Sequence, residues 1–388
     1  MTDNFFSIII ILMRWLFFSP LVFLVYGGIC FYIGFRLLGF LCYFIPVKPA
    51  AFWIPFALLF CILVFGNFFG HNLLFLRKAG SYWIAVLMYM FLLLALSDFI
   101  KLLLLLFGKK IPNFNFYAAA GALFLCITLI IFGALHARSI KTVNYQLTLP
   151  GSGSNIRITL ISDLHIGSTV GKTWIKRIAD TVNKTQPDIV CITGDIFDGN
   201  LDVIKDLPGV ITQLKSINAP LGVYACLGNH DIDRMSFGGA KTERIAEILE
   251  SAGITLLWDE VYPIRENLFI AGRKDARPIG MNAGRKTPDE LLADIEGTVI
   301  VLDHQPTQYP QLEKAGADLV LSGHTHKGQL FPANLFTRSI FKKAGAVHYG
   351  RWKGQNMQGI VTSGAAVWGP PLRVGTNSEA VVIDVKWE

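Results

Sequence analysis

Four long apolar runs in the first 140 residues constrain this chain more than any other feature of its sequence. A transmembrane helix requires about 20 consecutive apolar residues, and lipid tails offer no hydrogen-bond partners to an isolated non-helical segment. The sequence therefore predicts an all-α transmembrane region over residues 1–140, with about four helices near residues 15–35, 51–70, 81–107 and 115–135. A fifth helix remains open, because the apolar stretch over residues 5–46 could hold two short spans.

The net charge of +7 belongs to this apolar region rather than to the rest of the chain. Ten of the 35 Lys and Arg residues, but only two of the 28 Asp and Glu residues, lie within residues 1–150. Residues 151–388 are consequently close to neutral, whereas a nucleic-acid binder needs clustered positive charge to meet the phosphate backbone. We therefore expect no nucleic-acid partner, and we expect contact with membrane lipids.

The charges of the loops give a slight preference for one topology. In a four-helix arrangement, four basic residues share a side with the C-terminal domain: Arg77, Lys78, Arg138 and Lys141. Three basic residues lie on the opposite side: Lys48, Lys109 and Lys110. Because cytoplasmic loops carry the excess of Lys and Arg, the prediction is a multi-pass protein of the plasma (inner) membrane with its C-terminal domain in the cytoplasm.

Two charged side chains fall inside the third apolar run. Asp98 and Lys101 are three residues apart and therefore share one face of a helix. Charges at membrane depth are costly, so an Asp98–Lys101 pair could mark a functional site. It could equally be a pair whose charged ends reach the membrane interface.

A polar segment separates the apolar region from an α/β domain. Residues 141–155, which contain Pro150 and the run Gly151-Ser-Gly, are predicted to be a linker. The domain covers residues 156–388, with strands expected over residues 156–161, 188–193, 221–227, 267–272, 298–302 and 318–322. Apolar residues at helical spacing predict helices over residues 169–186, 203–217 and 241–252.

Five short blocks of metal-ligand residues follow the predicted strands of this domain. They are Asp163-Leu164-His165, Gly194-Asp195-Ile196-Phe197-Asp198, Gly228-Asn229-His230-Asp231, His304 and Gly323-His324-Thr325-His326. Five of the eight histidines of the chain lie in these blocks. Carboxylate, imidazole and amide oxygen suit Mn, Fe or Zn rather than a thiolate site. The loops at the carboxyl ends of strands are where open α/β sheets gather such ligands, and glycines 194, 228 and 323 permit sharp turns into them.

In their order and composition the blocks resemble the calcineurin-like metallophosphoesterase family, over about residues 157–388. The tail Ser363-Gly-Ala-Ala-Val-Trp-Gly-Pro-Pro-Leu-Arg resembles the membrane-anchored branch of that family, the transmembrane proteins with a metallophosphoesterase domain. The resemblance implies an α/β/β/α sandwich that binds two divalent metal ions (Mn, Fe or Zn). The chain departs from the family pattern at Lys327, in the loop that enters the site, where relatives often have a small residue.

The resemblance also implies a role for each residue of the blocks. One metal would be held by Asp163, His165, Asp195 and His326. The other would be held by Asp195, Asn229, His304 and His324, so that Asp195 bridges the two ions. The catalytic residues would be His230, which assists departure of the leaving-group oxygen, and Asp231, which fixes the tautomer of His230. Asp198 would orient a ligand from behind.

The implied reaction is cleavage of a phosphodiester or pyrophosphate bond by metal-activated hydroxide. The anchor suggests a lipid-linked phosphoester substrate, and some relatives cleave the pyrophosphate of UDP-diacylglucosamine in lipid A biosynthesis. Two alternatives remain open: a broad phosphodiesterase for soluble substrates, and a non-enzymatic membrane sensor that binds metal or nucleotide.

Three further residues lie near the expected site. Arg373 could bind a phosphate or could pair with Glu379, and the residues leave both options open. Trp352 and Trp368 fall in C-terminal loops that would form the rim of the site.

Overall fold

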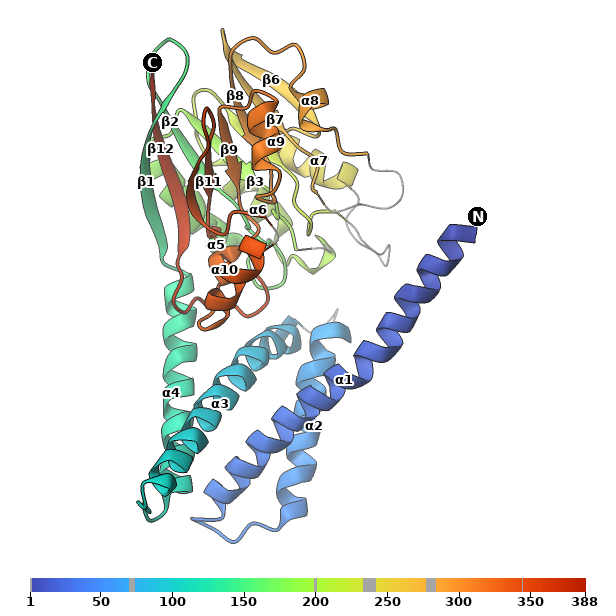
Figure 1. Ribbon diagram of the computed structural model, residues 1–388, viewed down its shortest axis with the longest axis vertical. Coiled ribbons are helices and arrows are strands. Elements are labelled where there is room, and N and C mark those ends of the chain that lie inside the picture. Colours follow the sequence, from blue (N-terminus) through green and yellow to red (C-terminus); the bar gives the residue numbers. More distant parts are fainter. Residues whose placement is uncertain (1, 70–73, 199–200, 233–241, 277–283, 344) are drawn as a thin grey trace. The chain divides into compact units, whose positions relative to one another are not determined.

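The computed structural model describes residues 2–69, 74–198, 201–232, 242–276, 284–343 and 345–388 (Figure 1). The chain forms two compact units, Met1–Ile131 and Phe132–Glu388, and each is described by itself.

The first unit is helical, as the apolar runs predict. Its helices are α1 (Thr2–Leu41), α2 (Pro49–Phe69), α3 (Leu74–Leu106) and α4 (Phe114–Ala137), and the last residues of α4 belong to the second unit. Within the described residues, three segments are long and apolar enough to cross a membrane: Leu24–Leu41, Phe75–Leu106 and Phe114–Ala137. The apolar part of α2 over Pro49–Leu63 is shorter, so the fourth span, predicted near residues 51–70, stays a prediction. Residue 70 lies outside the described residues.

The charged pair predicted within α3 does not form. Asp98 instead pairs with Arg36 of α1 and accepts a hydrogen bond of 2.5 Å from the Tyr32 hydroxyl, while Lys101 donates to Asn115 Oδ1 at 2.9 Å. The reason is that Arg36 is buried, with its side chain 8% exposed, and Asp98 is the only acidic residue between residues 4 and 162. A buried guanidinium without a counter-charge is costly, so Asp98 joins two helices rather than marking one face of α3.

The second unit contains two mixed six-stranded sheets. The first has the order β1-β12-β2-β3-β4-β5 and consists of β1 (Ile140–Leu149), β12 (Ser378–Trp387), β2 (Ile156–Ile161), β3 (Ile189–Thr193), β4 (Val223–Cys226) and β5 (Thr255–Leu256). The second has the order β10-β11-β9-β8-β7-β6 and consists of β10 (Gly350–Lys353), β11 (Gln358–Val361), β9 (Leu319–Ser322), β8 (Thr298–Leu302), β7 (Leu268–Gly272) and β6 (Glu260–Arg265).

The two sheets pack face to face, and helices cover their outer faces. Apolar side chains of both sheets share one core, to which β2, β3, β7, β8, β9 and β12 all contribute. A second core lies between the first sheet and α5 (Lys172–Lys184), α6 (Leu207–Lys215) and α7 (Thr242–Ser251). A third lies between the second sheet and α8 (Pro288–Leu291) and α9 (Tyr309–Lys314), and α10 (Ala333–Lys343) follows β9. The predicted α/β/β/α sandwich is confirmed.

The prediction of a linker over residues 141–155 is wrong for residues 141–149. These residues form β1, which pairs in parallel with β12 from Ile140 opposite Ser378 to Leu149 opposite Trp387. The apolar residues of β1 recur at every second position, and Leu147 and Leu149 are only 2% and 1% exposed. This period-two pattern is that of a strand with one buried face, and it protects β12 from becoming a free edge.

The end of α4 joins the second unit at the loop that precedes β12. Ala137 is fully buried, and its carbonyl accepts a hydrogen bond of 2.7 Å from the Ser378 hydroxyl. The backbone N–H of Arg373 donates to the carbonyl of Gly133 at 3.0 Å. The ring of His136 lies 2.9 Å from Asn377 Oδ1. A helix that is apolar enough to span a membrane therefore continues directly into the α/β unit.

The burial of β1 leads to a stability prediction. We expect Leu147→Ala to lower the stability of the second unit by about 2–5 kcal/mol, because it leaves a cavity beside β12. Gln146→Ala changes an exposed neighbour and should leave stability within about 0.5 kcal/mol. Thermal and denaturant unfolding of the purified protein would measure both. Equal unfolding curves for the two variants would show that residues 141–149 act only as a tether.

Candidate metal centre

The five ligand blocks lie at the carboxyl ends of five strands from both sheets. Asp163 follows β2, Asp195 follows β3, Asn229 follows β4, His304 follows β8 and His324 follows β9. Within each sheet these strands are parallel to one another, so their carboxyl ends meet at one edge. The packing of the two sheets then brings both sets of loops together.

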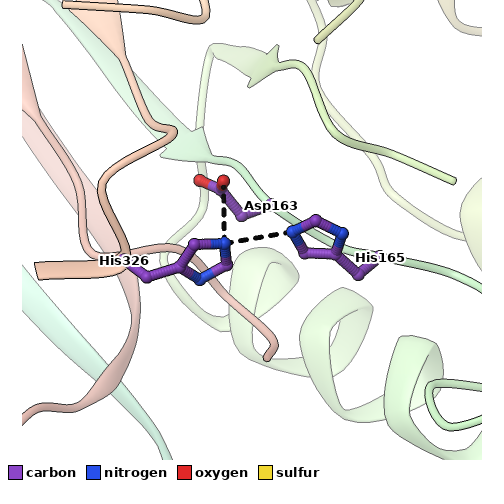
Figure 2. A group of neighbouring side chains, drawn as sticks. All are labelled: Asp163, His165 and His326. Atoms are coloured by element: carbon purple, nitrogen blue, oxygen red, sulfur yellow. Dashed lines mark hydrogen bonds and ion pairs between the residues drawn. The ribbon is translucent and has the colours of Figure 1, made fainter. Parts of the chain in front are cut away.

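A first group of donor atoms comes from Asp163, His165 and His326 (Figure 2). The donor atoms of the group lie within 4.8 Å of one another, and His165 Nε2 and His326 Nε2 are only 3.0 Å apart. Asp163 Oδ1 lies 3.3 Å from His326 Nε2. Two imidazole nitrogens and a carboxylate oxygen that converge on one point are a typical donor set for a divalent transition-metal ion.

A second group of donor atoms comes from Asp195, His304 and His324, again within 4.8 Å of one another. His304 Nε2 lies 3.1 Å from Asp195 Oδ2, and the same carboxylate oxygen lies 3.8 Å from His165 Nε2. Asp195 therefore lies between the two groups, which is the position that a bridging ligand requires.

Backbone geometry at the ligands is unusual. Five of them have positive φ angles between 43° and 70°: Asp163, His165, Asp195, His324 and His326. Residues other than glycine rarely adopt this backbone conformation. Each one costs about 1–3 kcal/mol of stability, so it persists only where the surrounding structure enforces the conformation. The concentration of strain at the ligands indicates that the fold holds them for their position rather than for stability.

The glycines before the ligands have two separate roles. Gly194 has a φ of 79°, which permits the turn predicted from the sequence. Gly228 and Gly323 instead permit close packing. A Cβ atom on Gly228 would lie 2.3 Å from Asp195 Oδ1, and one on Gly323 would lie 1.9 Å from Ser162 Oγ. A side chain at either position would therefore displace a ligand loop.

Polar contacts behind the ligands fix their orientation. His304 Nδ1 lies 2.8 Å from the carbonyl oxygen of Thr193, so Nδ1 carries the proton and Nε2 presents its lone pair to the site. The carboxylate of Asp163 accepts the backbone N–H of His324 at 3.1 Å. The loop that carries His324 thus also orients the carboxylate of Asp163.

The donor set fits two divalent cations. Asn229 is 8% exposed, and its Oδ1 atom has no hydrogen-bond donor among the described residues. An unpaired buried amide oxygen costs about 1–3 kcal/mol, and a cation beside Asp195 would satisfy it. Burial raises the pKa of Asp163, and this effect outweighs the lowering by the charges of His304 and His165. Divalent ions bound here would neutralise these carboxylates and polarise a phosphoryl oxygen.

His230 lies beside this centre and is not among the proposed metal ligands. Its side chain is 28% exposed, its backbone N–H donates to Asp195 Oδ1 at 2.8 Å, and its Nδ1 lies 3.1 Å from Asp198 Oδ1. Burial would lower the pKa of His230, but its hydrogen bond to Asp198 and the charges of Asp195 and Asp198 raise it overall. The raised pKa favours the protonated ring, which can present a proton at Nε2.

The predicted role of Asp231 is wrong. Its carboxylate accepts the backbone N–H groups of Ile196, Phe197 and Gly228, at 3.2, 2.7 and 2.8 Å, whereas Asp198 is the carboxylate that meets Nδ1 of His230. Burial raises the pKa of Asp231 to about 7, with a further contribution from Asp195. Asp231 therefore joins two ligand loops, and Asp198 is the residue that orients His230.

Arg373 has neither of the roles left open by the sequence. It is fully buried and donates to the carbonyl oxygens of His326, Ser363 and Ala366, at 3.1, 2.6 and 2.6 Å. Burial lowers its pKa to about 10. Glu379 accepts instead from the Tyr349 hydroxyl at 3.0 Å. Arg373 thus holds the loop of His326 in place.

The two tryptophans near the expected rim differ in their surroundings. Trp368 is 52% exposed, and its ring lies 5.8 Å from the ring of His230, so it borders the site. Trp352 packs edge-on against Tyr309 at 5.3 Å, as a packing residue of the second sheet.

Comparison with known proteins places this fold and donor set in a class. The sequence profile of the calcineurin-like phosphoesterases matches residues 156–328. A metallophosphoesterase of Campylobacter jejuni is 30% identical over 305 residues, which are 74% of this chain and 76% of that protein. One from Aquifex aeolicus is 30% identical, over 68% of this chain and 98% of that protein. A transmembrane protein with metallophosphoesterase domain from Danio rerio is 28% identical, over 88% of this chain and 82% of that protein.

The chain belongs to the calcineurin-like metallophosphoesterase family. It is therefore a phosphoester hydrolase that depends on divalent metal ions. The three long apolar helices and the similarity to proteins named as transmembrane indicate that it associates with a membrane.

The contact between Asp198 and His230 leads to a kinetic prediction. We expect Asp198→Asn to lower kcat about 10- to 100-fold, because the ring loses the carboxylate that orients it and raises its pKa. Bound metal, measured by elemental analysis, should stay unchanged.

The matched variant is Asp231→Asn, in which a carboxamide faces three backbone N–H groups. It should lower stability by about 1–3 kcal/mol. If Asp231→Asn abolished turnover at full stability while Asp198→Asn kept full activity, the assignment made from the sequence would be restored.

Proposed function

We propose that the protein is a membrane-anchored phosphohydrolase with a dinuclear metal centre that cleaves a phosphodiester or pyrophosphate bond. The observation that carries this proposal is the position of Asp195 between two donor groups, directly beside a partly exposed His230. The proposed ligands of one ion are Asp163, His165, Asp195 and His326. Those of the other are Asp195, Asn229, His304 and His324, with Mn, Fe or Zn as the metal.

The side chains divide the chemical work between them. His230 would donate its proton to the leaving-group oxygen, and Asp198 would hold the opposite ring nitrogen during that transfer. Asn229 contributes a neutral oxygen, which leaves the site less negative than a further carboxylate would. The exposed ring of Trp368 limits access to one side of His230. This arrangement favours catalysis over a purely metal-sensing role, since a sensor has no need of a proton donor.

The membrane helices support a substrate that is presented at the bilayer surface. Tethering raises the local concentration of the enzyme at its substrate. We propose a lipid-linked phosphoester, with UDP-diacylglucosamine as the specific candidate. In this proposal the protein spans the plasma (inner) membrane several times, and the second unit faces the cytoplasm.

Hydrolysis of bis-p-nitrophenyl phosphate tests the reaction. We expect the purified protein to turn over this phosphodiester with added Mn and to lose activity with a chelator. Asp195→Asn should lose at least about 100-fold in activity together with bound metal. His230→Ala should lose roughly 100-fold with its metal retained. Bound metal without turnover of any phosphoester would favour the sensor.

A second experiment tests the substrate class. We expect kcat/KM for UDP-diacylglucosamine in mixed micelles to exceed that for bis-p-nitrophenyl phosphate by roughly tenfold or more, because the anchor brings the site to the lipid. Release of the two products can be followed by mass spectrometry. Comparable values for lipid-linked and soluble substrates would favour the broad phosphodiesterase.

A further inference from the structure

Beyond the end of α4, most of the exposed large apolar side chains of the second unit lie in one place. Between residues 138 and 388, six such side chains are exposed among the described residues. One of them, Tyr262, lies alone on β6. The other five are Phe331, Leu335, Phe336, Ile340 and Trp368. Four of these come from a single stretch of ten residues on and just before α10, and we call Phe331, Leu335, Phe336 and Ile340 the α10 patch.

Helix α10 has the composition of a helix that lies at a membrane surface. Leu335, Phe336 and Ile340 are 61%, 66% and 62% exposed, and none of the residues of α10 is buried. At 100° per residue these three side chains fall within an arc of about 140°. The helix also carries Arg338 and two lysines in its last turn, and it contains no acidic residue. Aromatic and aliphatic residues on one face with basic residues beside them are typical of interfacial helices.

The adjoining face of α10, which shares Leu335 with the α10 patch, lines a basic pocket of about 990 Å³. Of the eleven described residues that line it, none is acidic, and three carry positive charge: Lys327, Arg338 and Lys342. Tyr349 and Trp352 supply apolar walls, and the ammonium group of Lys327 lies 3.8 Å from the centre of the Tyr349 ring. A pocket of this charge suits an anionic group that is attached to an apolar body.

Two contacts connect the surroundings of this basic pocket to the metal centre. The Thr325 hydroxyl, between ligands His324 and His326, donates to the carbonyl oxygen of His348 at 2.7 Å. The ring of Phe341 in α10 lies 6.0 Å from the ring of His324. Lys327, where the chain departs from the family pattern, follows His326 directly and points its charge at this pocket rather than at a metal ligand.

The same region is tied to the end of the membrane-spanning helix. The backbone N–H of Phe331 donates to the carbonyl of Val374 at 2.8 Å, and the neighbouring Arg373 N–H donates to Gly133 in α4 at 3.0 Å. Hydrogen bonds of the loop of residues 372–378 therefore link Gly133 of α4 to the residues that precede α10. Gly133 lies in the apolar segment Phe114–Ala137, so the start of α10 is held close to the end of a segment that is apolar enough to enter a lipid bilayer.

We propose that α10 lies in the headgroup layer of the membrane, with the α10 patch toward the acyl chains and the basic pocket on the phosphate of an anionic lipid. The occupant is a bilayer surface, because the apolar face, the basic charge and the adjoining span all suit one. This inference deepens the proposed function, on which its catalytic meaning rests. The pocket would hold the headgroup of a lipid beside the metal centre.

Spin-label accessibility tests this placement without any need for turnover. The full-length protein, with its exposed Cys42 and Cys61 replaced by Ser, is labelled at Ile340→Cys and reconstituted into phosphatidylcholine nanodiscs with and without phosphatidylglycerol. Tyr262→Cys provides the matched control, since Tyr262 is also exposed, at 45%, and lies on β6. We expect oxygen to relax the label at position 340 more strongly than a water-soluble nickel chelate does, and the reverse at position 262.

The basic pocket is tested in the same labelled protein. We expect phosphatidylglycerol to increase the immersion of the label at position 340, and we expect Arg338→Gln with Lys342→Gln to remove that increase. Lys353→Gln, an exposed lysine outside the pocket, should preserve it. Equal access of the nickel chelate to positions 340 and 262 would overturn the proposal. So would protection at position 340 that depends on two copies per disc, because a second copy would then cover the patch. Loss of catalysis would affect neither readout.

Discussion

The structure of the site depends on one buried carboxylate, that of Asp195. Its oxygens lie 3.1 Å from His304 Nε2 and 3.8 Å from His165 Nε2, and one of them accepts the backbone N–H of His230. Burial would raise the pKa of Asp195, but the charge and hydrogen bond of His304 hold it well below its usual range. Histidines from two sheets can meet at one carboxylate only if the sheets are locked face to face, so the apolar core between them sets the geometry of the centre.

The residues that gather in the two donor groups could be selected from the sequence, because their signals are local. An apolar strand that ends in a ligand residue can be recognised without knowledge of the rest of the fold, and parallel strands bring such ends together. The partner of His230 could not be recognised in this way. Asp231 is adjacent in sequence, yet three backbone N–H groups of neighbouring loops take its carboxylate, and these contacts exist only in the folded chain.

The other differences between sequence and structure also arise from distant partners. From the sequence alone, the alternating residues of β1 are interpreted as a linker. The strand that pairs with β1 is β12, which lies more than 220 residues further along the chain. Asp98 has Lys101 nearby in α3 but pairs with Arg36, 62 residues away. The buried guanidinium of Arg373 donates hydrogen bonds to carbonyl oxygens at three separate loop positions rather than to a carboxylate or a phosphate. In each case the sequence shows the local pattern, but it does not show which distant residue becomes the partner.

These long-range contacts meet in the loop of residues 372–378. Through its side chain, Arg373 holds the carbonyl oxygen of metal-ligand residue His326, and through its backbone N–H it holds Gly133 at the end of α4. The next residue, Val374, accepts the N–H of Phe331 at the entrance to α10. A buried arginine has few alternative arrangements, because losing any of its acceptors leaves a charge unsatisfied in the interior. Gly133 near the end of α4, the start of α10 and the loop of His326 are therefore held together within the second unit, so one buried side chain links the start of this unit to the rim of its candidate metal centre.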